Sequence, residues 1–334
     1  MDPRAPSNDG ILDPFFISLV NDPRDVPFVK LTIGCALMAF AGIGLYFAGD
    51  WVFYLAPFYW AVWALVFLDR FILMLHCTSH RMLYKKKYKW MNQIIPWAIG
   101  PFFGETPETY FVHHMGMHHP ENNLEGDLSS TIRYQRDKFT HWVRYFCRFF
   151  FGTVIELALY HYRKKNMKMF RRMLVGELGF WTAVTALMFV NWAATLVVFV
   201  IPVVMVRVLM MCGNWGQHAF VDASDPGNAY KNSITCINTR YNRRCFNDGY
   251  HIHHHVKARC HWSEYPAEFE DNKLTYGEQD AIVFEGIDFF QVWVYLMMRR
   301  YKKLATHFVQ LPGAPERDSA EIVQFLRSRL QPIR

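Results

Sequence analysis

The chain has few cysteines, and their spacing fits neither an extracellular framework nor a zinc ribbon. Seven cysteines occur in 334 residues, at positions 35, 77, 147, 212, 236, 245 and 260. Since disulfide frameworks and zinc ribbons place cysteines in short pairs, we expect reduced thiols here. The sequence also lacks a haem-binding His-Pro-Gly-Gly motif, a glycine-rich nucleotide fingerprint and an iron–sulfur cysteine set. It therefore predicts no redox cofactor module within these residues.

Charged residues are scarce in two long stretches near the N-terminus, although the whole chain has a formal net charge of +7. Residues 28–48 contain only Lys30, and residues 51–75 are apolar up to Asp69 and Arg70. Each stretch has the roughly 20 residues that a helix needs to cross a bilayer core. Only Gly49 and Asp50 separate them. The two stretches therefore predict a hairpin of membrane-spanning helices.

A second apolar block covers residues 176–212, with Asn191 and Trp192 near its middle. Its length allows two spans of roughly 18 residues each, at 176–192 and 193–212, with a tight reversal at Asn191. Buried helices of a soluble core are the alternative, but such helices rarely stay apolar on every face for so long. We therefore predict an all-α membrane protein with four transmembrane helices in two hairpins.

The distribution of lysine and arginine predicts the orientation of these spans. The two predicted turns carry neither residue, whereas residues 76–175 carry sixteen. The positive-inside rule places this loop and both termini on the cytoplasmic side. Residues 1–27, which do not look like a cleaved signal peptide, are expected to be a flexible cytoplasmic N-terminus, residues 28–265 the membrane domain and residues 266–334 a cytoplasmic segment. The membrane is the endoplasmic reticulum in a eukaryote or the inner membrane in a bacterium.

Histidine is the residue that this chain has in unusual density. Eleven of its 15 histidines fall into four clusters, which are HCTSH at 76–80, HHMGMHH at 113–119, NWGQH at 214–218 and HIHHH at 251–255. Neutral imidazole is the commonest transition-metal ligand in proteins, and spacings of three or four residues place side chains on one face of a helix. The clusters predict a metal site, and the predicted topology places all four on the cytoplasmic face. The solitary histidines, at 141, 161, 261 and 307, are interpreted as surface or interfacial residues.

The spacing within the clusters gives a candidate ligand set of nine nitrogens, which suits two metal ions. It comprises His76, His80, His114, His118, His119, His218, His251, His254 and His255. We expect His114 and His118 to share a helix face and His119 to turn toward the second ion. His113 and His253 are expected to hydrogen-bond beside the ligands or to face solvent, and not to bind a metal directly. Asp248 is a candidate to hydrogen-bond the outer nitrogen of a ligand. A metal transporter or receptor is disfavoured, because the spans have almost no ionisable residues.

These clusters resemble the three histidine boxes of the membrane fatty acid desaturase superfamily, and NWGQH resembles the NxxxH element of its acyl-CoA desaturase branch. The resemblance covers about residues 28–265 and implies that the nine histidines ligate two irons (Fe²⁺/Fe³⁺), with Asn214 reaching the site through a water. It also implies a four-helix membrane stem under a cytoplasmic helical cap that carries the boxes, and a tunnel for a fatty acyl chain.

The activity implied by the resemblance is desaturation of a fatty acyl chain with dioxygen as co-substrate. Electrons come from an external donor, such as cytochrome b5 or ferredoxin with its reductase. The basic segments suit this donor and anionic membrane lipid, and no nucleic acid is expected. The second box, with its three-residue gap and the run from Asp127 to Ser130, also resembles membrane alkane hydroxylases. Hydroxylation, or oxidative decarboxylation to a terminal alkene, therefore stays an alternative outcome.

Overall fold

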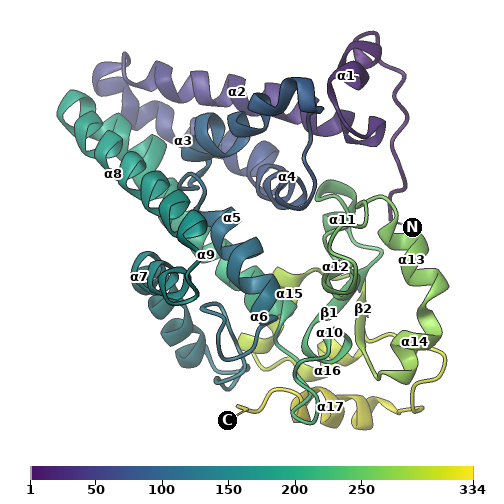
Figure 1. Ribbon diagram of the computed structural model, residues 1–334. Coiled ribbons are helices and arrows are strands. Elements are labelled where there is room, and N and C mark those ends of the chain that lie inside the picture. The colour runs from purple at the N-terminus through teal and green to yellow at the C-terminus, as the bar shows by residue number, and fades with distance from the viewer. Residues whose placement is uncertain (1, 334) are drawn as a thin grey trace. The chain divides into compact units, whose positions relative to one another are not determined.

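The computed structural model describes residues 2–333 and is mostly helical (Figure 1). Its chain forms two compact units. The long-helix unit comprises residues 5–114 and 158–207, and the C-terminal unit comprises residues 115–157 and 208–333 together with residues 2–4. Each predicted histidine box therefore belongs to one unit or lies at the boundary between them.

The long-helix unit contains six α-helices and several short 3₁₀ or π-helical segments. Its α-helices are α1 Asp13–Leu19, α2 Val26–Leu45, α3 Val52–Val62, α4 Asp69–His80, α5 Thr109–His113 and α8 Met167–Thr195. The short segments are η1 Pro23–Asp25, η2 Gly49–Trp51, η3 Trp63–Leu68, η4 Lys86–Gln93, η5 Ile94–Ile99, η6 Gly100–Phe103 and η8 Leu196–Val200. Helices α7 Phe139–Arg163 and α9 Ile201–Gln217 and the π-helical turn η7 His114–His118 contain residues of both units.

The first predicted hairpin corresponds to α2 and the continuous helical segment Gly49–His80. Pro27 lies in the first turn of α2, where its missing N–H breaks no helical bond. The chain turns at Gly49, whose φ of 54° is a left-handed conformation that glycine adopts without strain. Thr32 Oγ1 lies 3.5 Å from Met74 Sδ, 42 positions later. The two helical segments therefore pack side by side.

The second apolar block forms part of a 51-residue helical segment, Met167–Gln217, which reverses direction at Asn191. Asn191 has extended backbone angles, φ −156° and ψ 97°. The rings of Phe180 and Phe199 are 6.4 Å apart, whereas one straight helix would separate these residues by roughly 28 Å. Asn191 Oδ1 also accepts a hydrogen bond from the N–H of Ala194, as a residue does at a helix start. The chain therefore turns back where the sequence predicted a reversal.

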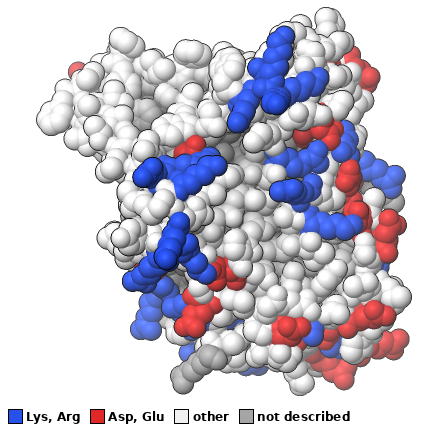
Figure 2. Space-filling model, in the orientation of Figure 1, with Lys and Arg blue, Asp and Glu red and all other residues white. Residues whose placement is uncertain are grey.

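The two hairpins pack against each other near this reversal. The hydroxyls of Tyr46 and Thr195 are hydrogen-bonded at 2.8 Å, and Trp60 Nε1 donates to the carbonyl of Val197 at 3.0 Å. The outer surfaces of these helices carry large exposed apolar side chains, such as Phe58 at 74% and Phe189 at 89% exposure. In Figure 2 the corresponding region, at the upper left, is almost without charge. Three helical segments in the described residues, Pro23–Leu45, Gly49–His80 and Met167–Gln217, are long and apolar enough to cross a membrane.

Within the long-helix unit, the loop before the second histidine box is tied to α8. The carboxylate of Glu177 accepts hydrogen bonds from Thr106 Oγ1 at 2.6 Å and Thr109 Oγ1 at 2.7 Å. A Cβ at Gly176 would stand 1.8 Å from the carbonyl oxygen of Pro107, so the contact requires glycine. These contacts fix the start of α5, which leads into the second box.

The C-terminal unit combines short helices with a two-stranded parallel sheet. Besides its parts of α7 and α9, its helices are α6 His119–Glu121, α10 Ala229–Asn232, α11 Arg240–Arg244, α12 His251–Val256, α13 Tyr265–Asp271, α14 Lys273–Glu278, α15 Phe289–Met297, α16 Tyr301–Ala305 and α17 Ser319–Ser328. Strands β1 Ile234–Ile237 and β2 Ile282–Glu285 pair with Ile234 opposite Ile282. This sheet corrects the all-α prediction, because two four-residue apolar strands are too short to show a period of two.

The N-terminal residues have defined structure, with contacts at Asp2 and a helix at α1. Asp2 is buried, and its carboxylate accepts hydrogen bonds from the N–H of Asn238 at 2.7 Å and the hydroxyl of Tyr250 at 2.9 Å. Helix α1 lies within residues 1–27, which the sequence predicted to be flexible. The predicted limits at residues 27/28 and 265/266 concern the membrane, and they remain predictions.

Candidate metal centre

Two glycines allow the elements that carry the third and fourth clusters to approach their neighbours. A Cβ at Gly216, inside NWGQH, would stand 2.4 Å from the carbonyl oxygen of Phe289. A Cβ at Gly249, two residues before the last box, would stand 2.3 Å from the carbonyl oxygen of Cys236. Both positions therefore require glycine for close backbone approach. They place the end of α9 and the start of α12 against the core of the C-terminal unit.

Three predicted ligands meet in the long-helix unit. His76 and His80 lie one turn apart at the end of α4, with ring centroids 5.3 Å apart. The Nε2 atoms of His80 and His114 are 2.8 Å apart, and the ring of His76 lies 4.6 Å from that of His114. Tyr110 stacks on His114 at 5.2 Å. We call these histidines the trio, and each directs a nitrogen toward the others.

Four further ligands meet in the C-terminal unit, where His118, His218, His251 and His255 each offer one nitrogen within 4.8 Å of the other three. We call them the quartet. The Nε2 atom of His251 lies 3.1 Å from those of both His218 and His255. His119 and His254 form a separate pair, with Nε2 atoms 3.0 Å apart. The structure thus brings all nine predicted histidines into close groups, of which each lies within one unit.

One detail of the predicted spacing is wrong. His114 and His118 were expected to share a helix face, but His114 belongs to the trio and His118 to the quartet. Each of the two instead groups with histidines from other segments, since the rings of His76 and His114 are 4.6 Å apart and those of His118 and His218 are 5.2 Å apart.

The quartet has the electrostatics of a cation site. Burial lowers the pKa of His218 to about 3, with a smaller contribution from His118. Burial also holds the pKa of His255 well below its usual value, helped by its histidine neighbours. Neutral imidazoles whose Nε2 atoms converge at about 3 Å cannot all hydrogen-bond one another, since each Nε2 carries either one proton or one lone pair. Nitrogen-only donor sets of this kind suit iron, copper, nickel and zinc.

The outer nitrogens of two quartet members have defined partners. His118 Nδ1 lies 2.7 Å from Asp127 Oδ2, and the other oxygen of Asp127 accepts from the N–H and the hydroxyl of Ser129, both at 2.8 Å. His218 Nδ1 lies 2.9 Å from the carbonyl oxygen of Asn232. An ionised carboxylate and a carbonyl can only accept, so both Nδ1 atoms carry the proton. Each Nε2 is then left with the lone pair that a metal requires.

Sequence reasoning missed the role of Asp127, although it singled out the Asp127–Ser130 run as a point of resemblance. It proposed Asp248 as the carboxylate partner. Asp248 accepts from Tyr241 Oη at 2.6 Å and from Gln217 Nε2 at 3.4 Å, and its role beside a ligand stays a prediction. Asn214 Nδ2 donates to the carbonyl of Ser129 at 3.0 Å and to Tyr145 Oη at 2.7 Å. These contacts link Asn214 to the segment that holds Asp127.

Two of the four solitary histidines are not at the surface, so that prediction is wrong for them. His161 is only 1% exposed, and its Nε2 lies 3.3 Å from the carbonyl oxygen of Val112. His261 is equally buried and hydrogen-bonded to Ser263 Oγ at 2.7 Å. A lone histidine has no neighbouring pattern from which burial could be inferred. His141 accepts a hydrogen bond from the N–H of Gln135 and lies outside the histidine groups.

Membrane-length apolar helices and converging neutral imidazoles define the class, a membrane-associated protein with a polyhistidine metal centre. The fatty acid desaturase family matches residues 49–286, which is most of the chain. The chain belongs to this family, and the resemblance of its histidine boxes is thereby confirmed. The family identifies it as an oxidoreductase that acts on fatty acyl lipid. Comparisons with curated proteins and with solved structures gave no match.

Proposed function

We propose that this protein is a di-iron, dioxygen-dependent desaturase of a fatty acyl chain. The observation that carries the proposal is the convergence of neutral histidine nitrogens in a chain of the desaturase family. The quartet would hold one iron, and the nine predicted histidine ligands together suit two. A donor set without thiolate is suited to dioxygen chemistry, because it offers the oxidant no sulfur to attack.

The residues of the chain hold and orient the metal. When bound, the irons supply the activation of dioxygen that removal of hydrogen from an alkyl chain requires. Asp127 and the carbonyl of Asn232 fix the tautomers of His118 and His218, so that both Nε2 atoms face the metal. Overall, one acyl –CH₂–CH₂– unit and dioxygen, with two electrons and two protons from outside, give one –CH=CH– unit and two waters.

We further propose that four spans in two hairpins anchor the protein, with both termini cytoplasmic. The reversal at Asn191 and the packing of the two hairpins near Tyr46 support four spans. The absence of lysine and arginine from the two turns supports the orientation. The external electron donor, such as cytochrome b5 or ferredoxin with its reductase, then approaches from the cytoplasmic side. The membrane is the endoplasmic reticulum or the bacterial inner membrane.

A second outcome of the same chemistry is hydroxylation or decarboxylation, which the second box favours. That box has a three-residue gap, and the Asp127 that follows it contacts its own His118. Hydroxylation replaces one C–H hydrogen by oxygen, and decarboxylation shortens the chain by one carbon.

A chain-deuterated acyl substrate, turned over in labelled dioxygen, separates the three outcomes. Desaturation removes two deuteriums from neighbouring carbons and incorporates no labelled oxygen. A labelled alcohol, or a terminal alkene one carbon shorter, as the main product would overturn the desaturase assignment and leave the metal centre intact. The His118→Ala variant is the matched control for background oxidation by the host.

A further inference from the structure

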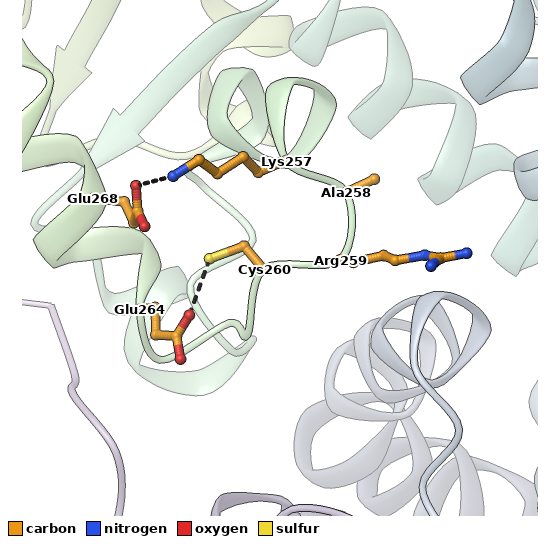
Figure 3. A pocket seen from close by; sticks show the side chains of 6 residues that line it. All are labelled: Lys257, Ala258, Arg259, Cys260, Glu264 and Glu268. Atoms are coloured by element: carbon orange, nitrogen blue, oxygen red, sulfur yellow. Dashed lines mark hydrogen bonds and ion pairs between the residues drawn. The ribbon is translucent and has the colours of Figure 1, made fainter.

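A second group of metal-ligating side chains lies in the C-terminal unit, outside the nine histidines. It lines a surface pocket formed by the end of α12, the following loop and α13 (Figure 3). The pocket residues are Lys257, Ala258, Arg259, Cys260, Glu264 and Glu268. Figure 3 shows Cys260, Glu264 and Glu268 grouped around this pocket, while Arg259 points away from them.

Three different donor atoms converge beside this pocket. A ring nitrogen of His253, the sulfur of Cys260 and a carboxylate oxygen of Glu268 all lie within 4.8 Å of one another. His253 Nε2 is 3.9 Å from Glu268 Oε2. The carboxylate of Glu264 adds a fourth donor, with Oε2 3.4 Å from Cys260 Sγ. A nitrogen, a sulfur and one carboxylate thus lie close together, and the Glu264 carboxylate adjoins their sulfur.

His253 provides an independent sign that something else binds here. The residue is 3% exposed, and its Nε2 atom has no hydrogen-bond partner among residues 2–333. A buried polar nitrogen without a partner is destabilising, so native structures seldom contain one. This nitrogen faces Cys260 and Glu268, which makes a cation at that place its natural partner.

We propose that His253, Cys260 and Glu268, with Glu264 as the fourth ligand, bind one zinc ion. Tetrahedral zinc takes nitrogen, thiolate and carboxylate ligands at roughly 2.0–2.3 Å, so its ligands stand less than about 4 Å apart. The donor atoms lie within 4.8 Å of one another, so side-chain rotation would have to bring them somewhat closer when the ion binds. Zinc has no redox chemistry, and it therefore leaves the Cys260 thiolate intact, as a dioxygen-activating iron would not. The ion ties the loop after the last histidine box to α13 and has a structural role.

The present contacts of Lys257 identify a competitor for the same site. Its Nζ lies 2.6 Å from Glu268 Oε2, where it supplies the positive charge that a metal ion would bring. The Lys257 side chain is 54% exposed, so it is able to swing into solvent when an ion binds. Removing this ammonium group should therefore strengthen zinc binding.

Cobalt substitution tests the site, because cobalt bound to a thiolate has a sulfur-to-metal charge-transfer absorption that nitrogen ligands do not give. The purified full-length protein, loaded with cobalt, is expected to show this absorption, and the Cys260→Ser variant is expected to lose it. Cys77→Ser, which removes the cysteine inside the first box, should keep it. So should His118→Ala, and this separates the zinc site from the proposed di-iron centre.

Zinc content supplies the second measurement. The wild-type protein should retain about one zinc per chain after iron is removed, and Glu268→Gln should lose at least half of it. Lys257→Ala should bind zinc more tightly, by roughly tenfold or less. A folded Glu268→Gln variant with unchanged zinc content, or a cobalt absorption that survives Cys260→Ser, would overturn the proposal.

Discussion

Asp127 should control the metal affinity of the quartet through the protonation of His118. One oxygen of Asp127 accepts two hydrogen bonds from Ser129, while the other faces His118 Nδ1 at 2.7 Å. In Asp127→Asn, the amide oxygen is expected to keep the Ser129 bonds, because only an oxygen accepts them. The amide NH₂ group then faces Nδ1, which has to accept. His118 Nε2 would carry the proton and could no longer ligate a metal.

Alanine and asparagine at position 127 should therefore lower metal binding and turnover by different factors. Asp127→Ala removes the hydrogen-bond partner of His118 Nδ1, but either tautomer of His118 can still form. Loss of such a contact typically lowers metal affinity about 10–100-fold. Asp127→Asn imposes the wrong tautomer, for which a loss in turnover of roughly 10⁴-fold is known in another enzyme. The assay is iron content per chain together with product formation. An Asn variant that binds iron and turns over as well as the Ala variant would refute this reasoning.

Three further predictions concern the ligands, the membrane and a buried acid. Alanine at a box histidine, such as His76 or His218, should abolish turnover with the protein still folded, whereas His141→Ala should be nearly silent in the same product assay. Accessibility tags at residue 2 and at the Gly49–Asp50 turn should report opposite sides of the membrane. Burial raises the pKa of Glu105 to about 8, so between pH 4.5 and 8 folding requires a proton that the unfolded chain has released. Stability should fall as pH rises through this window, and Glu105→Gln should remove the trend in thermal unfolding measured in detergent.

The apolar helices and the ligand set could be predicted because both depend on local patterns. Membrane-length helices need about 20 apolar residues in a row, and the reversal at Asn191 interrupts such a run with a polar residue. The histidine clusters are recognisable in the sequence because histidine is so dense there. All nine predicted ligands lie in close groups in the structure. The sequence does not predict which of these histidines belongs to which group. That depends on which distant segments meet, as His76 meets His114 and His218 meets His118, and spacing within one segment does not reveal such contacts.

Contacts between segments far apart in the chain could not be predicted, for a different reason. The parallel pairing of β1 with β2 joins residues 48 positions apart, and neither strand shows alternation. The partner of His218 is a backbone carbonyl, at Asn232, and any residue type supplies one. Asp127 could have been found, since it follows its own ligand by only nine residues. Asp248 lies three residues before a ligand and accepts a hydrogen bond from Tyr241, and its predicted role stays a prediction.

Helix α12 shows how one short element can serve two sites of different chemistry. Successive residues of an α-helix are rotated by about 100°, so His251, His254 and His255 fall within roughly 100° of one another, while His253 points to the opposite side. His251 and His254 face His218 and His119 of the other boxes, and His253 faces Cys260 and Glu268. A rigid attachment on the His253 side would hold the opposite face in register, and metal ligands need positions accurate to about 0.5 Å. A redox-inert ion beside the last box is therefore a physically sound way to position its ligands.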